Sequence, residues 1–238
     1  TKADAQTIVD RFEDTILLDT EDELLETFLQ LIDDADVMSG WNSEGFDIPY
    51  MVNRIARVLG KEHTRRFCLW GKYPNRREFE RYGKAQETYD TVGRLHLDYM
   101  ELYRKYTYHE MHSYSLDAIG EYELGERKTE YQGTLDQLYN NDFETFIRYS
   151  RQDVDLLVRM DKKLQFIDLA NVIAHDNTVL VQTTMGAVAV TEQAIVNEAH
   201  KRGFIIPNRP YREPHSSGAA VGAYVATPKK GLHDWIAS

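Results

Sequence analysis

Short apolar runs alternate with longer amphipathic segments along this chain, and this alternation is the feature that most limits its possible folds. The runs at residues 15–18, 37–41 and 95–97 have the length and composition of buried strands. After the second run, apolar residues recur at helical spacing from Asp47 to Gly60. Strands that alternate with helices predict an α/β architecture, in which helices pack on a sheet.

Capping residues mark the predicted ends of several helices. Thr20 and Glu23 form a capping box, in which a hydroxyl and a carboxylate satisfy free backbone N–H groups at a helix start. Further helices are expected over residues 99–106, 115–123, 142–167 and 187–200. In the longest of these, the inward positions are expected to be Phe143, Phe146, Ile147, Val154, Leu157 and Leu164.

Positive charge gathers around a polar, aromatic stretch at residues 78–92, which predicts an exposed β-hairpin. The chain has a formal net charge of −11, yet residues 54–84 hold ten Lys or Arg and three acidic residues. A basic segment on an acidic body can hold a phosphate backbone while carboxylates elsewhere bind metal. The alternative is a solvated face whose charges protect the hairpin edge from pairing. The candidate phosphate contacts are Arg76, Arg77, Arg81 and Lys84.

Composition excludes several other classes of protein. No apolar run is long enough to span a membrane, and no signal-peptide pattern opens the chain. The single cysteine, Cys68, excludes an internal disulfide and a Cys-rich zinc site. One free thiol is typical of a reducing compartment, so a cytoplasmic location is expected.

Two groups of polar residues stand where chemistry is expected. Asn42 and Asp47 flank a strand-to-helix junction, and such junctions carry ligand sites in open α/β folds. Tyr149 and Asp153 are four residues apart, so they share one face of the longest helix. A carboxylate can hold a metal while a neighbouring phenol orients the attacking water.

These residues also have purely structural interpretations. Asp47 could cap a helix, Asn42 could form a turn, and Phe46 could belong to the core. The Tyr-x-x-x-Asp pair could be half-buried without a function. Asp98 follows a predicted strand and is expected to have a structural role.

The order and spacing of these motifs resemble family-B DNA polymerases, those of T-even-like bacteriophages among them. Asn-x-x-x-Phe-Asp-x-Pro-Tyr, followed about 100 residues later by Tyr-x-x-x-Asp, is similar to the second and third exonuclease motifs of that family. The likeness continues through residues 97–103, 113–117, 163–167 and 222–225. The resemblance implies a ribonuclease H-like fold, a mixed sheet flanked by helices. It also implies an exonuclease domain at residues 1–165, a helical connector at 166–208 and the beginning of a polymerase palm at 209–238.

The resemblance also implies a site and its cofactors. Asp47 and Asp153 would bind two Mg²⁺ or Mn²⁺ ions, and Tyr149 would position the attacking water. Asn42 would lie near the terminal nucleotides, and Phe46 would stack beside them. The implied reaction is 3′→5′ proofreading hydrolysis of the terminal phosphodiester.

The implied partners follow from the same family. They are a single-stranded 3′ end, the primer–template and the remaining polymerase segments, in cis or as a separate chain. Tyr224, in a segment similar to the one that links the exonuclease and polymerase domains, is a further candidate DNA contact. No membrane partner is implied, and a phage protein of this kind works in the cytoplasm of its bacterial host.

Two departures from the family pattern change the expected activity. Asp19-Thr20-Glu21 has the letters of the family's first exonuclease motif, but it lies much closer to Asp47 than the family places it. Its position in a capping box favours a structural role, so the true Asp-x-Glu motif is expected to be missing. No polymerase aspartates are found, so nucleotide addition by this chain alone is not expected.

Two rival functions stay open from the sequence. One is a free-standing exonuclease, in which Asp19 and Glu21 would complete the site. The other is a non-catalytic DNA-binding or assembly fragment that needs a partner chain. For the favoured function, the chain alone is expected to bind metal poorly and to cut DNA weakly or not at all.

Overall fold

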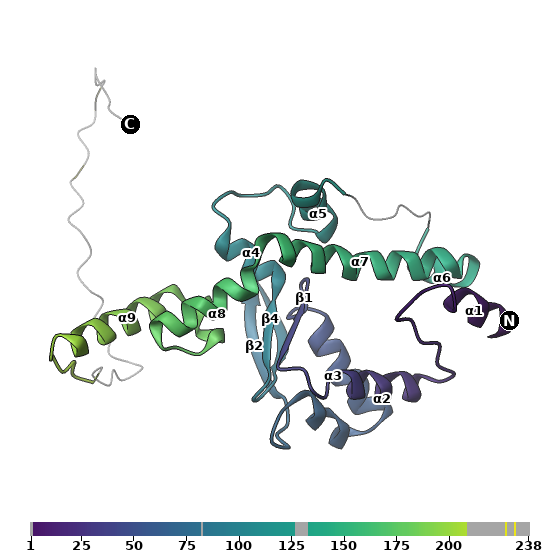
Figure 1. Ribbon diagram of the computed structural model, residues 1–238, viewed down its shortest axis with the longest axis horizontal. Coiled ribbons are helices and arrows are strands. Elements are labelled where there is room, and N and C mark those ends of the chain that lie inside the picture. Colours follow the sequence, from purple (N-terminus) through teal and green to yellow (C-terminus); the bar gives the residue numbers. More distant parts are fainter. Residues whose placement is uncertain (1, 82, 127–132, 209–226, 228–230, 232–238) are drawn as a thin grey trace.

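The computed structural model describes residues 2–81, 83–126, 133–208, 227 and 231 (Figure 1). The helices are α1 (Lys2–Val9), α2 (Glu21–Leu31), α3 (Asp47–Val58), α4 (Tyr99–Tyr106), α5 (Leu116–Leu124), α6 (Leu135–Asn141), α7 (Phe143–Leu164), α8 (Phe166–Asn177) and α9 (Ala187–Lys201). The strands are β1 (Val37–Gly40), β2 (Asn75–Arg81), β3 (Lys84–Asp90) and β4 (Leu95–Asp98). Two 3₁₀ helices are η1 (Lys61–Phe67) and η2 (Val181–Met185).

The strands form two separate pairs within the described residues. β1 and β4 run parallel, with Gly40 opposite Asp98 at their carboxyl ends. β2 and β3 form an antiparallel hairpin, with Asn75 opposite Asp90 at its base. The strands predicted at residues 37–41 and 95–97 and the predicted hairpin are therefore confirmed. The parallel register brings the segments that leave β1 and β4 to one edge of the sheet.

Local capping signals located the helix ends well. The Thr20 hydroxyl accepts a hydrogen bond from the Glu23 backbone N–H at 3.4 Å, and the helix that follows is α2. Ser115 caps α5 in the same way, and Gly125 ends it in the left-handed conformation with φ of +73°. A glycine suits that position because a Cβ atom disfavours positive φ.

The strand predicted at residues 15–18 is wrong. These residues have no regular secondary structure, and Ile16 is exposed. The segment is held instead by α7, because Arg151 donates hydrogen bonds to the carbonyl oxygen of Glu13 and, at 2.7 Å, to the hydroxyl of Thr15. The backbone N–H and C=O groups of a helix are already hydrogen-bonded within the helix. Contact with α7 therefore cannot pair residues 15–18 as a strand.

The longest predicted helix, 142–167, is divided in the structure. α7 ends at Leu164, and Gln165 has a left-handed φ of +54° before α8 begins. The break turns Phe166 into the core, where its ring lies 6.1 Å from that of Tyr99 and 5.6 Å from that of Tyr106. Burying the Phe166 ring there offsets the cost of a left-handed residue other than glycine.

The predicted inward face of α7 is also partly wrong. Val154 is 64% exposed, whereas Leu156 and Met160 are fully buried. Leu156 lies 3.5 Å from the position that a Cβ on Gly120 would occupy, so α7 packs closely on α5. This face of α7 is set by contact with α5, which local periodicity does not reveal.

Two hydrophobic clusters lie on opposite sides of the parallel strands, and helices cover both sides (Figure 1). One contains Leu97 of β4 with residues of α4, α5, α7 and α8. The other contains residues of α2, α3 and η1, with Met38 of β1 packed against it. The arrangement is the predicted layered α/β architecture. Within the described part of the chain, no helix has the length and apolar character needed to cross a membrane.

Candidate functional site

The loop that connects β1 to α3, here called the site loop (residues 42–47), is held by a buried carboxylate. Asp98, at the end of β4, is 6% exposed. Its Oδ1 accepts a hydrogen bond from the Asn42 backbone N–H at 3.0 Å, and its Oδ2 accepts one from the Glu44 N–H at 3.1 Å. Oδ1 also accepts from the N–H of Met100 and so caps α4. The structural role expected for Asp98 is confirmed.

Asp47 stands at the exposed amino end of α3. It is the first helical residue, and the residue in the cap position is Phe46, so the interpretation of Asp47 as a helix cap is wrong. Partial burial of the carboxyl raises the pKa of Asp47 above its usual value, against an opposing backbone hydrogen bond. The side chain is nevertheless open to solvent and can meet a ligand.

An aromatic pair flanks Asp47. The rings of Phe46 and Tyr50 lie 5.8 Å apart and 12° from parallel. Phe46 is 62% exposed and Tyr50 is 53% exposed, so the core interpretation of Phe46 is wrong. Sequence analysis missed Tyr50, although its spacing of four residues from Phe46 is the signal that places both rings on one side of the helix.

Tyr149 and Asp153 lie on the face of α7 that turns toward the protein. Both are half-buried, and they continue a series through Leu156 and Met160 at helical spacing. Oδ1 of Asp153 is screened from solvent. The two side chains therefore share a face, as predicted, and that face borders the core.

The residue before the site loop contacts the hydrophobic cluster to which α7 contributes. Trp41, next to the site loop, packs against the cluster that contains Leu156, and its indole N–H donates to the carbonyl oxygen of Tyr114 at 3.0 Å. Among the residues that the structure describes, however, no group of three or more His, Cys, Asp or Glu side chains could hold a metal ion. Neither Asp47 nor Asp153 therefore belongs to a three-ligand cluster in the described part of the chain.

The Asp19-Thr20-Glu21 segment is used structurally. Besides the cap formed by Thr20, the Glu23 carboxylate accepts a hydrogen bond from the backbone N–H of Asp19 at 3.1 Å. Glu21 forms a bidentate ion pair with Arg54 of α3, and this hydrogen bonding lowers the pKa of Glu21. The structural interpretation of this segment is confirmed.

The arginines at the base of the hairpin are engaged by carboxylates. Arg76 pairs with Glu87 and, at 3.5 Å, with Glu78. Arg77 pairs with Glu44 of the site loop and, at 3.0 Å, with Asp90. Burial works to lower the pKa of Arg77, but the hydrogen bonds to Asp90 and Glu44 outweigh it and raise the pKa.

The other predicted DNA contacts have no described side chains. Tyr224 and the segment 222–225 lie outside the described residues, as do the side chains of Arg81 and Lys84. Their roles stay predictions.

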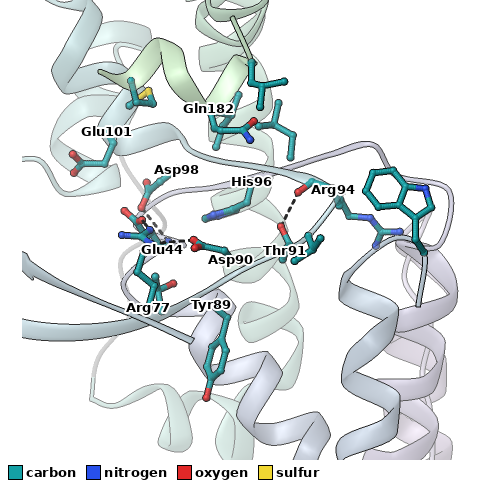
Figure 2. Close-up of a pocket in the computed structure, with 18 residues that line it drawn as sticks. Glu44, Arg77, Tyr89, Asp90, Thr91, Arg94, His96, Asp98, Glu101 and Gln182 are labelled. Carbon is teal, nitrogen blue, oxygen red and sulfur yellow. Dashed lines mark hydrogen bonds and ion pairs between the residues drawn. The ribbon is translucent and has the colours of Figure 1, made fainter. Parts of the chain in front are cut away.

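A cleft of about 880 Å³ opens beside these ion pairs, between the hairpin, β4 and η2 (Figure 2). His96 of β4 lines it, and its Nε2 lies 2.8 Å from the hydroxyl of Ser43 in the site loop. Burial lowers the pKa of His96. This imidazole beside a buried hydroxyl is a second link between β4 and the site loop that the sequence did not reveal.

Comparison with known proteins decides the family. Residues 3–119 match the family described as DNA polymerase family B, exonuclease domain. Residues 3–119 belong to the exonuclease domain family of the family-B DNA polymerases. The family resemblance and the ribonuclease H-like α/β class expected from the sequence are thereby confirmed. Tyr149 and Asp153 lie beyond the matched residues, so their assignment stays a prediction.

The chain is similar to DNA polymerases of phages and of an animal, among others. The chain is 28% identical to the DNA-directed DNA polymerase of Enterobacteria phage T4 over 222 residues, which cover 92% of this chain and 24% of the phage protein. The corresponding polymerase of Escherichia phage RB69 is 29% identical with the same coverage. The DNA polymerase delta catalytic subunit of Drosophila melanogaster is 27% identical over 235 residues, 90% of this chain and 20% of that protein. The chain thus spans about a quarter of the length of the phage relatives.

Proposed function

We propose that this chain carries part of the 3′→5′ proofreading exonuclease site of a DNA-directed DNA polymerase. One observation carries the proposal. Asp47 stands at the exposed start of α3 beside the stacked rings of Phe46 and Tyr50, inside the residues that match the exonuclease family. A carboxylate beside an aromatic platform suits the hydrolysis of a single-stranded end, because one group can bind metal while the rings hold bases.

Exonuclease domains of this family depend on metal ions. The donor chemistry of Asp47 and Asp153 fits Mg²⁺ or Mn²⁺, because hard cations take carboxylate and water oxygens. Two such ions, when bound, supply positive charge to the attacking and leaving oxygens of the phosphodiester. Among the described residues, neither carboxylate belongs to a cluster of three possible ligands. The proposal therefore includes weak metal binding by this chain alone, with further ligands supplied by another polymerase segment.

The remaining side chains have separate tasks in the proposed reaction. The Tyr149 phenol, one helical turn from Asp153, orients the attacking water. Asn42 contacts the terminal nucleotide from the loop that Asp98 holds in place. Phe46 and Tyr50 stack against unpaired bases. Stacking accepts any base, which proofreading requires.

Removing the aromatic pair is expected to weaken binding of single-stranded DNA. Phe46→Ala and Tyr50→Ala should each raise the dissociation constant of a labelled oligothymidylate roughly tenfold, because base–aromatic stacking contributes about 1–3 kcal/mol per base. Fluorescence anisotropy with the full chain measures this. Tyr108→Ala is the matched control, since Tyr108 is fully exposed elsewhere on the surface. Equal affinities for all three variants would contradict a stacking role.

The structure argues against one of the two rival functions and is consistent with the other. A free-standing exonuclease would need Asp19 and Glu21 beside Asp47 and Asp153. The pairing of Glu21 with Arg54 and the lack of a three-ligand cluster among the described residues argue against it. A non-catalytic DNA-binding or assembly fragment is consistent with the shortage of ligands. A hydrolysis assay separates it from the proposed function.

The proposed setting follows from the relatives. The partners are a single-stranded 3′ end, the primer–template and the other polymerase segments, in cis or as a separate chain. The host cytoplasm is the proposed location. The division into an exonuclease domain at 1–165, a connector at 166–208 and the start of a palm at 209–238 is likewise a proposal.

A further inference from the structure

Three charged side chains connect the hairpin to the site loop. The guanidinium of Arg77, on β2, donates from Nη2 to the Glu44 carboxylate and from Nε to Oδ1 of Asp90 at 3.0 Å (Figure 2). Glu44 lies in the site loop, and Asp90 is the last residue of β3. One arginine therefore links both strands at the base of the hairpin to the loop that presents Asp47.

Glu44 is held from two sides. Its backbone N–H donates to Oδ2 of Asp98 at 3.1 Å, and its side chain accepts from Arg77. The neighbouring Ser43 contacts His96 of β4 at 2.8 Å. The side chain of Glu44 is mostly sheltered from solvent, whereas that of Asp90 is about half exposed. The Arg77–Glu44 contact is the better screened of the two pairs, so solvent weakens it less.

Among the residues that the structure describes, the adjacent Arg76 forms no ion pair with the site loop. Side chains alternate between the two faces of a strand, so Arg76 and Arg77 point in opposite directions. Arg77 lies opposite the buried Thr88 and reaches the site loop. Arg76 forms ion pairs with Glu78 and Glu87, both within the hairpin. A substitution of Arg76 is therefore the matched control for the same substitution of Arg77.

We propose that Arg77 is a positioning residue that acts through Glu44 to fix the site loop to the base of the hairpin. The Arg77 guanidinium is paired with the carboxylates of Glu44 and Asp90, so Arg77 does not serve as a phosphate contact. A movement of the hairpin is transmitted to Asn42, Phe46 and Asp47 through this arginine. The effect on DNA handling rests on the proposed function, whereas the mechanical link does not.

Hydrogen exchange of the full chain tests the mechanical link without DNA. Arg77→Gln and Glu44→Gln are each expected to speed exchange of the Asn42 and Glu44 amides roughly tenfold, because local opening becomes easier. The double variant should exchange no faster than either single variant, and Arg77→Lys should restore part of the protection. Amides of Leu156 and Met160 should be unchanged, which reports an intact core. Unchanged exchange in the site loop of Arg77→Gln, or equal acceleration in Arg76→Gln, would overturn the proposal.

The salt dependence of DNA binding tests whether Arg77 contacts a phosphate of the DNA. If Arg77 contacted a phosphate, its loss would lower the slope of log affinity against log salt by about 0.7, and Glu44→Gln would free the arginine and tighten binding. The proposal predicts an unchanged slope for Arg77→Gln and no tightening for Glu44→Gln. The opposite results would assign Arg77 to the DNA and overturn the proposal. If the chain bound no single-stranded DNA at all, the proposed function would fail here, while the exchange experiment would still decide the link.

Discussion

Asp98→Ala is expected to lower the free energy of unfolding by about 3 kcal/mol, because it removes a buried carboxylate that accepts three backbone hydrogen bonds. The loss leaves the N–H groups of Asn42, Glu44 and Met100 without this acceptor. Urea denaturation followed by circular dichroism measures the change. The site loop should lose its shape as well, so DNA binding should fall with stability.

A conservative replacement of Asp98 tests the same anchoring role with a smaller expected loss of stability. In Asp98→Asn, the amide oxygen can still accept from Asn42 and Met100, but the amide nitrogen then faces the N–H of Glu44. A loss of about 2 kcal/mol is expected, between wild type and Asp98→Ala. Asp155→Ala is the control, because that exposed carboxylate pairs with Arg159 one turn along α7. A loss below about 1 kcal/mol in Asp98→Ala would contradict the anchoring role.

Phe166→Ala is expected to lower the free energy of unfolding by about 4 kcal/mol, because it leaves a cavity in the core. The Phe166 ring lies within 6.2 Å of the rings of Tyr99, Tyr103 and Tyr106, measured between centroids. Urea denaturation again provides the measurement. Val172→Ala, on an exposed position of the same helix, should have little effect. Similar losses in the two variants would show that Phe166 does not hold α8 against the body of the protein.

Features set by neighbouring residues were predictable from the sequence. The capping residue Thr20 acts on backbone groups within a few positions of itself, and the helix that it predicted begins where expected. The hairpin follows from a local polar, aromatic stretch. A structural role was expected for Asp98 despite its place after a predicted strand. Its three backbone partners come from two segments and became visible only in the structure.

Features set by distant contacts were not predictable. Residues 15–18 have the composition of a strand, but Thr15 is contacted by a side chain of α7, and a helix cannot form a ladder with them. The division of the long helix depends on three tyrosines that receive Phe166. Arg77 was predicted from local charge alone, and its ion pair with Glu44, 33 residues away, became visible only in the structure. In each case the deciding partner lies far away in the sequence.

The central claim is that Asp47 and Asp153 belong to one incomplete exonuclease site, and hydrolysis of a 5′-labelled single strand with Mn²⁺ tests it most directly. The purified chain is compared with the T4 polymerase, with Asp47→Ala and Asp153→Ala as variants. Shortening from the 3′ end is expected to be at least about 10³-fold slower than that of the relative, because the described residues hold no three-ligand cluster for metal. Any residual cutting should disappear in both variants. A rate within about tenfold of the relative, or residual 3′ cutting that survives both substitutions, would contradict the account.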